Sequence, residues 1–190
     1  MFYTVKLQET GQLIFYTAMK PLIHFVHGKE SGPWGTKIRY LADIARQMGF
    51  DVESLDYSST FDPVVRVKML INSCEKRPAD YLVGSSMGGW VAMTSSAAIP
   101  VKGLFLLAPA IDIPGYPPYR LGCDGNAIEI VHGWKDSLIP VENVIHFSRE
   151  HNCTLHLLDD EHRLKNRLDQ VGGYLKSFLV RMENGTPDPA

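Results

Sequence analysis

Short apolar stretches alternate along the chain with longer segments in which apolar positions recur at helical spacing. This alternation predicts an α/β fold of three layers, with a mostly parallel central sheet and helices on both faces. Several of the short stretches are almost continuously apolar, which is typical of strands buried between two helical layers. The expected strands of this sheet are Leu22–Val26, Asp51–Leu55, Tyr81–Val83, Leu104–Leu107, Ala127–Val131 and Thr154–Leu158.

The intervening helices carry signals at their ends. Thr36–Met48 has one apolar stripe and is followed by Gly49, a residue type that commonly ends helices. Pro63–Lys76 follows Asp62, whose carboxylate can cap the first turn. The remaining helices are expected at Met87–Ala98, Val141–His151 and Asn166–Glu183.

The two ends of the chain differ from this core. Phe2–Leu7 and Leu13–Ala18 flank a turn signal at Thr10-Gly11 and predict an N-terminal antiparallel hairpin. Asn184–Ala190 contains glycine and prolines and is expected to be a flexible tail. No internal repeat and no linker interrupts the 190 residues, so we expect a single domain over residues 1–183.

Composition and charge narrow the class of protein. With 45% hydrophobic residues the chain can bury a full core, which excludes global disorder. The 19 basic residues against 21 acidic ones give a net charge of -2, so a nucleic-acid partner is not expected. Lys6, Gln8 and Glu9 interrupt the apolar run that a signal peptide needs, and no apolar run reaches the roughly 18 residues of a membrane span.

Cysteine and histidine spacing gives no sign of a metal site. Cys74, Cys123 and Cys153 form no Cys-x-x-Cys pair and leave one thiol over in any disulfide scheme, which favours a reducing compartment. The histidines show no paired ligand spacing either. We therefore expect a cytoplasmic protein, a monomer or a homodimer, with no metal ion.

The most specific motif is Gly84-Ser85-Ser86-Met87-Gly88, a G-x-S-x-G sequence directly after a predicted strand and directly before a predicted helix. In that context the serine stands at the apex of a sharp strand-to-helix turn, and the glycines allow the backbones on either side to approach. Ser86 is therefore the expected nucleophile, presented at the carboxyl end of the sheet, where ligands of open α/β sheets bind.

A serine needs a base within hydrogen-bonding reach and an acid that orients the base. His162 follows the last predicted strand, where the chain order serine, acid, histidine requires the base. Asp136 follows the preceding strand and is favoured as the acid over Asp112, because a short loop leads from it into a helix. Five of the other six histidines are expected to pack or to lie at the surface: His24, His27, His146, His151 and His156.

Two backbone N–H groups are expected to form an oxyanion hole. One is the N–H of Met87, directly after the serine, and the other is the main-chain N–H of Lys29, in the glycine-rich loop after His27-Gly28. His27 would hold this loop in place. The candidate walls of a substrate pocket are four aromatic residues on loops of the same face, Trp34, Tyr116, Tyr119 and Trp134.

Four features occur in order, each after a predicted strand: the His27-Gly28 turn, the Gly84–Gly88 elbow, the Asp136 loop and the Asp160–His162 turn. With them the chain, over about 22–179, resembles the α/β-hydrolase superfamily and most closely its small, cap-less bacterial serine esterases. The resemblance implies a three-layer α/β-hydrolase fold. It also implies an enzyme that hydrolyses esters, thioesters or related acyl compounds through an acyl-serine, without metal or cofactor. Only Pro109–Asn126 occupies the place of a cap, so no cap domain and an open site are expected.

Three alternatives to an esterase remain open. An acyl-CoA thioesterase or a small peptidase would use the same three residues, and substrate profiling rather than sequence separates them from an esterase acting on small acyl substrates. From a different class, a hydrolase fold can serve as a non-catalytic binding module, since fold does not imply function. Such a module usually lacks one catalytic residue, whereas this chain has candidates for all of them.

Overall fold

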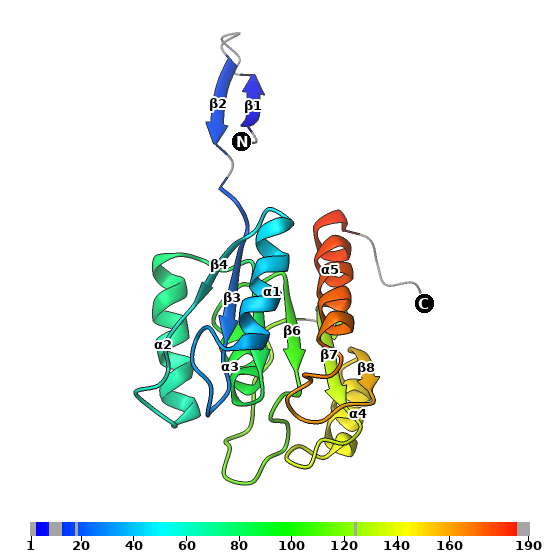
Figure 1. Cartoon of the computed structure of the whole chain (residues 1–190). Helices are drawn as coiled ribbons and strands as arrows, with labels where there is room; N and C mark the ends of the chain where they lie inside the picture. The colour runs from blue at the N-terminus through cyan, green and yellow to red at the C-terminus, as the bar shows by residue number, and fades with distance from the viewer. Residues whose placement is uncertain (1–2, 8–12, 18, 124, 186–190) are drawn as a thin grey trace.

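The centre of the structure is a six-stranded sheet in which every neighbouring pair of strands is parallel (Figure 1). The computed structural model describes residues 3–7, 13–17, 19–123 and 125–185. The strand order is β4-β3-β5-β6-β7-β8. These strands are β3 (Leu22–Val26), β4 (Asp51–Ser54), β5 (Tyr81–Ser85), β6 (Gly103–Leu107), β7 (Ile128–Gly133) and β8 (Thr154–Leu158). Every residue of β3, β6 and β7 is buried, which explains their almost continuous apolar sequences.

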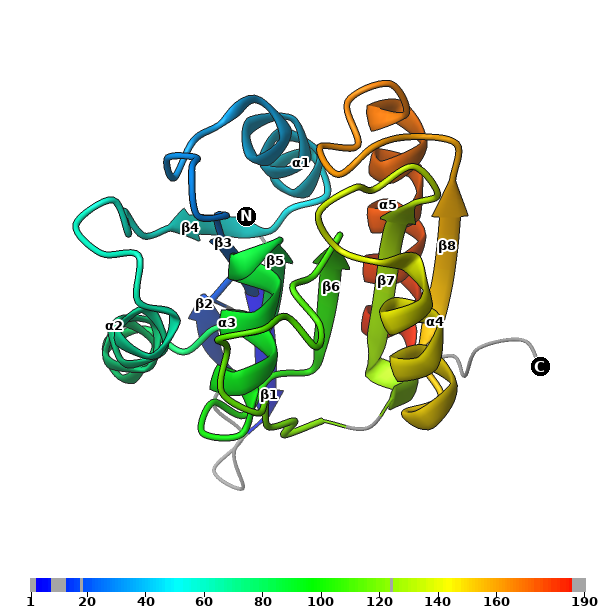
Figure 2. The same ribbon diagram turned by 90° about the horizontal axis from the view of Figure 1, so that it is seen from below.

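Helices cover both faces of this sheet (Figure 2). The helices are α1 (Thr36–Gln47), α2 (Pro63–Lys76), α3 (Met87–Ser96), α4 (Val141–Glu150) and α5 (Leu168–Asn184), with one 3-10 turn, η1 (Gly125–Ala127). α1 and α5 share one apolar cluster with the sheet, and α2, α3 and α4 share the other. The predicted three-layer arrangement is therefore confirmed.

The predicted strands and helices of the core are all present, with ends shifted by a few residues. Asp62 caps α2 as expected, because its Oδ1 accepts hydrogen bonds from the N–H groups of Val64 (2.8 Å) and Val65 (3.3 Å). α1 ends one residue early at Gln47, and Gly49 follows in a left-handed conformation at φ 94°. β5 runs on to Ser85, beyond its predicted end at Val83.

The N-terminal strands form a sheet of their own. β1 (Tyr3–Leu7) and β2 (Leu13–Thr17) pair in antiparallel register, with Val5 opposite Phe15. They do not join the central sheet, which is parallel throughout rather than mostly parallel. The predicted turn at Thr10-Gly11 lies outside the described residues.

The expected tail, Asn184–Ala190, lies mostly outside the described residues. Residues 186–190 lie outside the described part of the chain, Asn184 ends α5, and Gly185 caps that helix with φ 63°.

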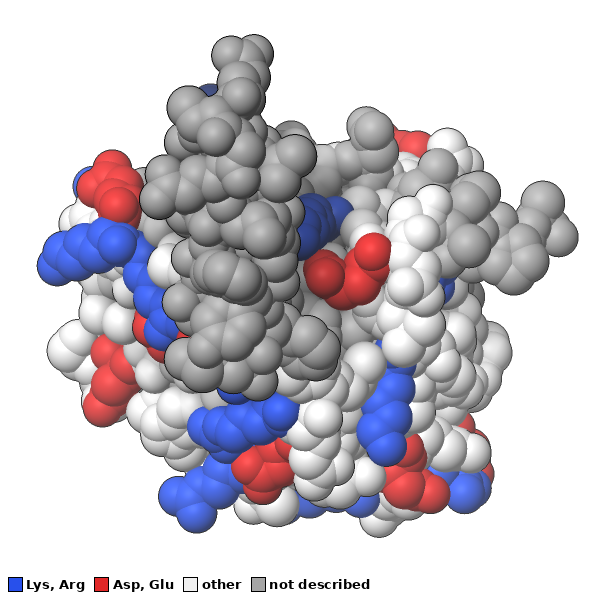
Figure 3. Space-filling model, turned by 90° about the horizontal axis from the view of Figure 1, so that it is seen from above, with Lys and Arg blue, Asp and Glu red and all other residues white. Residues whose placement is uncertain are grey.

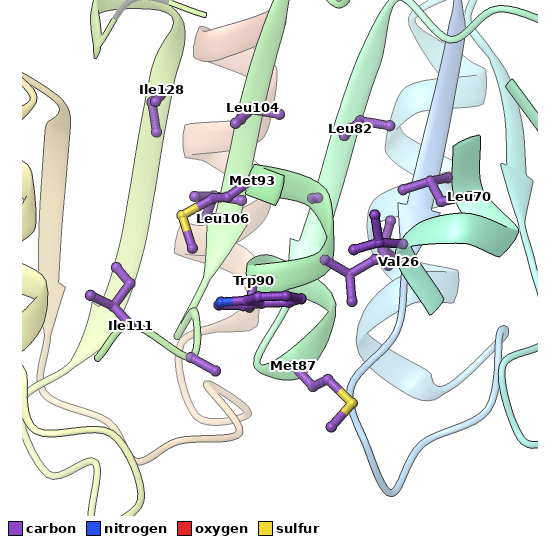
Figure 4. Close-up of a cluster of buried hydrophobic side chains, with 14 of the residues drawn as sticks. Val26, Leu70, Leu82, Met87, Trp90, Met93, Leu104, Leu106, Ile111 and Ile128 are labelled. Carbon is purple, nitrogen blue, oxygen red and sulfur yellow. The ribbon is translucent and has the colours of Figure 1, made fainter. Parts of the chain in front are cut away.

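The larger apolar cluster surrounds α3, the helix that follows the candidate nucleophile (Figure 4). Trp90 and Met93 of α3 pack with strand residues such as Leu104 and Leu106, and Leu70 of α2 belongs to the same cluster. α3 is buried nearly all round, and small or apolar residues therefore occupy nearly all of its faces. For this reason its sequence has no single apolar stripe. This packing fixes the start of α3 at the carboxyl edge of the sheet.

Charges on the opposite edge are mixed. Figure 3 views the molecule from that side, and Lys and Arg side chains are interspersed there with Asp and Glu, without an extended area of one sign.

No helix in the described part of the chain is long and apolar enough to cross a membrane. Between β6 and η1, residues 109–123 form neither helix nor strand.

Candidate active site

Ser86 stands at the turn between β5 and α3, with φ 55° and ψ -121°. This conformation is rare for a residue with a side chain and costs about 1–3 kcal/mol, so the surroundings must enforce it. The two motif glycines show how. A Cβ on Gly84 would lie 2.5 Å from the carbonyl oxygen of Gly88, and a Cβ on Gly88 would collide with the carbonyl of Val26. Only glycine at both positions allows β5, α3 and β3 to approach this closely.

Three side chains from separate loops meet at this turn in a hydrogen-bonded series. His162 Nε2 lies 3.0 Å from Ser86 Oγ, and His162 Nδ1 lies 2.7 Å from Asp136 Oδ2. Asp112, the competing acid, has an exposed side chain on the loop after β6. A series of this kind can move a proton from the serine hydroxyl to the imidazole and stabilise the imidazolium that forms.

The Asp136 carboxylate is held on its far side by the backbone. Its Oδ1 accepts hydrogen bonds from the N–H groups of Leu138 (2.8 Å) and Ile139 (2.9 Å), and its side chain is fully buried. Burial acts to raise the pKa of the Asp136 carboxyl, but the hydrogen bonds from His162, Ile139 and Leu138 outweigh burial and hold it below its usual range. The carboxylate therefore stays ionised and keeps the proton of the imidazole on Nδ1.

Asp160 organises the loop that carries His162. Its buried carboxylate accepts four hydrogen bonds, from the N–H groups of Glu161, Asn166 and Arg167 and from the Asn166 side chain. α5 begins at Leu168 and not at the predicted Asn166, because the backbone of Arg167, at φ -124° and ψ 28°, is not helical.

The loops after β7 and β8 are joined to each other. The Lys135 N–H donates to the Asp160 carbonyl (3.0 Å), and the Trp134 N–H donates to the Leu158 carbonyl (2.8 Å). These bonds hold the acid loop and the histidine loop as one unit.

Lys37 lies close enough to these loops to interact with both of their buried carboxylates. Burial lowers the pKa of Lys37 to about 8, and attraction to Asp136 and Asp160 opposes this decrease.

His27 holds the loop after β3. Its Nε2 accepts a hydrogen bond from the Tyr57 N–H (3.0 Å), so the proton resides on Nδ1, which donates to the Gly28 carbonyl (2.8 Å). Burial lowers the pKa of His27, in agreement with this neutral state. The imidazole therefore ties the loop after β3 to the loop after β4.

The expected oxyanion donors lie on the two sides of Ser86. Met87 is the residue after it, and Gly28, directly before Lys29, is close enough that a Cβ built on it would lie 3.4 Å from Ser86 Cβ. In the described part of the chain, neither the Lys29 N–H nor the Met87 N–H donates a hydrogen bond. The Lys29 ammonium is directed elsewhere, 5.7 Å from the centre of the Phe61 ring.

The four aromatic residues expected around a pocket are not brought together. A cavity of about 350 Å³ lies between α2, α3 and residues 117–120, and Tyr119 and Trp90 line it. Tyr116 packs edge-on against Trp90, with ring centres 5.6 Å apart. Trp34 instead lies under the Arg46 guanidinium, and Trp134 is 54% exposed beside the acid loop. Ser86 is not among the described residues that line this cavity.

Sequence reasoning missed three contributors to the site. Asp160 was seen only as part of a polar turn. His132 is buried 3.5 Å from the Asp136 carboxylate, with its Nε2 3.1 Å from the Ile139 carbonyl, and burial lowers its pKa. Arg66 is buried in α2. A signal existed for Arg66, because it is four residues before Leu70 and eight before Cys74, on the buried stripe of its helix.

The sheet order, the turn after β5 and the order of the site loops define an α/β-hydrolase fold, and the chain resembles proteins of that superfamily. No protein-family model matches the sequence, and no curated protein matches it. Solved structures do match. A Xanthomonas campestris pv. campestris protein assigned to the alpha/beta hydrolase superfamily has a TM-score of 0.78 and 29% identity, over 85% of this chain and 99% of its own.

Two further structures are more distant. Est1E from Butyrivibrio proteoclasticus has a TM-score of 0.73 at 21% identity, over 87% of this chain and 89% of its own. XC6422 from Xanthomonas campestris, an α/β serine hydrolase without a lid, has a TM-score of 0.69 at 18% identity, over 95% and 94%. At these identities the likeness shows the fold. The Xanthomonas campestris pv. campestris structure, at 29% identity, supports a general hydrolase function.

Proposed function

We propose that this chain is a serine hydrolase that cleaves carboxylic ester or thioester bonds of small acyl substrates through an acyl-serine intermediate. The observation that carries the proposal is the hydrogen-bonded series Ser86, His162 and Asp136 at distances of 3.0 and 2.7 Å. The N–H groups of Lys29 and Met87, which donate no hydrogen bond within the described part of the chain, support it, because acyl transfer requires donors for the oxyanion.

In the first half of the reaction, Ser86 Oγ attacks the substrate carbonyl carbon while His162 Nε2 takes the hydroxyl proton. The carbonyl oxygen becomes negative and accepts hydrogen bonds from the N–H groups of Lys29 and Met87. Asp136 stabilises the imidazolium through Nδ1–H. The bond to the leaving oxygen or sulfur then breaks, and that atom takes the proton from His162 Nε2, which leaves the acyl group on Ser86.

In the second half, water replaces the leaving group. His162 Nε2 takes a proton from water as the water oxygen attacks the acyl carbon, and the second tetrahedral intermediate uses the same two N–H donors. Its collapse releases the carboxylic acid, and His162 returns the proton to Ser86 Oγ. No group beyond these residues and water is required for the balance.

We also propose that the site is open, without a cap, and that residues 1–183 form one domain. The support is that residues 109–123 contain no helix or strand and that XC6422, which lacks a lid, is similar over 95% of this chain. Since Est1E binds ferulic acid, hydroxycinnamate esters belong in the substrate panel beside straight-chain esters and thioesters.

A fluorophosphonate probe tests the proposal, because it labels only an activated serine. We expect stoichiometric labelling, with the adduct located at Ser86 by peptide mass spectrometry, and hydrolysis of short-chain p-nitrophenyl esters. Ser86→Ala should remove both labelling and turnover. Ser85→Ala is the matched control at the neighbouring position and should keep both. No labelling of the folded wild-type protein would instead favour a binding module.

An acyl-chain series on the wild-type protein then separates the substrate classes. We expect kcat/KM for p-nitrophenyl esters and acyl thioesters to exceed that for the corresponding anilides, because the anilide leaving group is poorer. A preference for peptides or anilides would contradict the ester assignment and favour the peptidase alternative.

A further inference from the structure

Arg66 is a buried cation next to the loop expected to supply the oxyanion donor. It lies in the second turn of α2 and has no exposed surface. Its Nη1 donates to the carbonyl oxygens of Gly28 (3.1 Å) and His27 (3.3 Å), and its Nη2 lies 3.5 Å from the carbonyl oxygen of Lys29. Nε donates to the Thr60 carbonyl (3.0 Å). One side chain thus contacts three successive carbonyls from a segment more than thirty residues away.

The partners of Arg66 are unusual for a buried charge. Among the described residues no carboxylate hydrogen bonds to its guanidinium. The Tyr57 ring lies 5.5 Å away, and the exposed Asp56 carboxylate attracts the charge without contacting it in an ion pair. Burying a cation without a hydrogen-bonded anionic partner is costly, and an apolar side chain of similar volume would fill the same space at lower cost. The contacts with the loop carbonyls therefore indicate a role beyond packing.

Those contacts fix the direction of one peptide plane. In a trans peptide the C=O and the following N–H point in opposite directions. The Gly28 carbonyl accepts from Arg66 Nη1 and also from His27 Nδ1 (2.8 Å), so the Lys29 N–H points away from α2. A Cβ built on Gly28 would lie 3.4 Å from Ser86 Cβ, so this peptide lies beside the nucleophile, and the Lys29 N–H donates to no acceptor among the described residues.

We propose that Arg66 is a positioning residue for the oxyanion hole: its guanidinium holds the carbonyl side of residues 27–29, so that the Lys29 N–H remains directed at the oxygen that becomes negative. The same positive charge polarises the Gly28-Lys29 peptide and makes its N–H a stronger donor. This inference rests on the proposed serine hydrolase function. It assigns Arg66 an effect on the transition state, with little effect on substrate binding.

The test compares Arg66→Lys, Arg66→Gln and Arg66→Met with the wild-type protein. The measurements are kcat and KM for a p-nitrophenyl ester, and the inhibition constant of an aryl trifluoromethyl ketone, which forms a tetrahedral adduct with an activated serine. We expect kcat to fall about 10²-fold for the Gln and Met variants, as when one oxyanion donor is lost, with KM changed by less than about 3-fold. The affinity for the ketone should fall in proportion to kcat/KM, and Arg66→Lys should recover part of both.

Leu70→Ala is the control for a purely structural effect. Leu70 lies one turn further along the same buried stripe of α2, and its side chain belongs to the apolar cluster. This variant should lose thermal stability but keep kcat and the ketone affinity within about 3-fold when assayed well below its melting temperature.

Two results would overturn the proposal. The first is wild-type kcat and ketone affinity in folded Arg66→Lys and Arg66→Gln. The second is a loss of activity in the Arg66 variants that is no larger than the fraction of protein unfolded under the assay conditions. A wild-type protein that neither labels at Ser86 nor hydrolyses esters would overturn the proposed function as well. Normal labelling with unaffected Arg66 variants would overturn this inference alone.

Discussion

At the scale of single residues, the arrangement around His162 depends on which ring nitrogen carries the proton. The ionised Asp136 can only accept, so it requires the proton on Nδ1 and leaves Nε2 free to accept from Ser86. In Asp136→Asn the amide can donate to Nδ1, which places the proton on Nε2. We expect kcat for ester hydrolysis to fall roughly 10⁴-fold with the fold intact, the size of effect that follows loss of this tautomer.

The matched control for that variant is Asp159→Asn. Asp159 is an exposed carboxylate in the same pair of joined loops, where it pairs with Lys135 at 2.6 Å. Such exposed pairs contribute little, so kcat should stay within about 2-fold of wild type. Steady-state kinetics on both variants decide the matter: equal kcat values for Asp136→Asn and the wild type would remove Asp136 from the proposed relay.

The candidate site was predictable from sequence only where a residue follows a strand. Ser86, Asp136 and His162 each lie on a turn or loop that follows a predicted strand, and parallel strands bring their carboxyl ends to one edge, so their meeting follows from topology. Arg66 and Asp160 act through backbone atoms of distant or irregular segments. No residue pattern specifies which carbonyl a buried guanidinium will reach, and their contacts became visible only in three dimensions.

At the scale of elements, the turn between β5 and α3 depends on how closely α3 approaches β3. We predict that Gly88→Ala destabilises the protein by at least about 2 kcal/mol, because the added Cβ collides with the Val26 carbonyl and backbone cannot yield easily. Gly173→Ala is the control: Gly173 lies in α5, is exposed, and a Cβ there meets nothing within 4 Å. That variant should gain about 0.5–1 kcal/mol from helix propensity.

Urea unfolding followed by circular dichroism measures both free energies of unfolding. A Gly88→Ala protein as stable as the wild type would mean that α3 can move away from β3 at little cost. The strained turn would then not be enforced by this packing.

Element ends show where local sequence patterns stop being sufficient. α2 was predicted with the correct ends because Asp62, a local capping residue, determines its start. α5 begins two residues later than its pattern predicts because Arg167 has a non-helical backbone, in a segment whose N–H groups are bound by Asp160 from outside the helix. Likewise, the pattern of the first two strands predicts their pairing with each other but contains no information on whether they join the central sheet.

At the scale of the whole molecule, the fold joins two halves at one edge of the sheet. The first half supplies the loop after β3 and the α2 residues that hold it, and the second half supplies the joined loops after β7 and β8. Ser86 lies between them, directly after β5, and in Figure 2 this edge faces the viewer. The site geometry therefore requires that both halves of the sheet are folded.

That stability should depend on pH through three buried histidines. Burial lowers the pKa of His24, His27 and His132, although Glu53, 4.0 Å from His24, opposes the effect there. The unfolded chain binds protons at these rings below about pH 6.5, whereas the folded protein holds them neutral. The contribution of these histidines to the free energy of unfolding should therefore be complete above pH 6.5. It should decrease as the pH falls towards their lowered pKa values, by at most about 1.4 kcal/mol per pH unit for each histidine.

His24 allows the cleanest test, because both of its ring nitrogens are buried without a hydrogen-bond partner among the described residues. Replacing it in His24→Leu removes one proton-binding group from the unfolded state and one unsatisfied group from β3, so the slope of unfolding free energy between pH 8 and pH 5 should become shallower. His146→Gln, at a ring that is 77% exposed, should leave the slope unchanged. If urea unfolding gives the same slope for His24→Leu as for the wild type, His24 is not held neutral by the fold, and the acid sensitivity must arise from other groups.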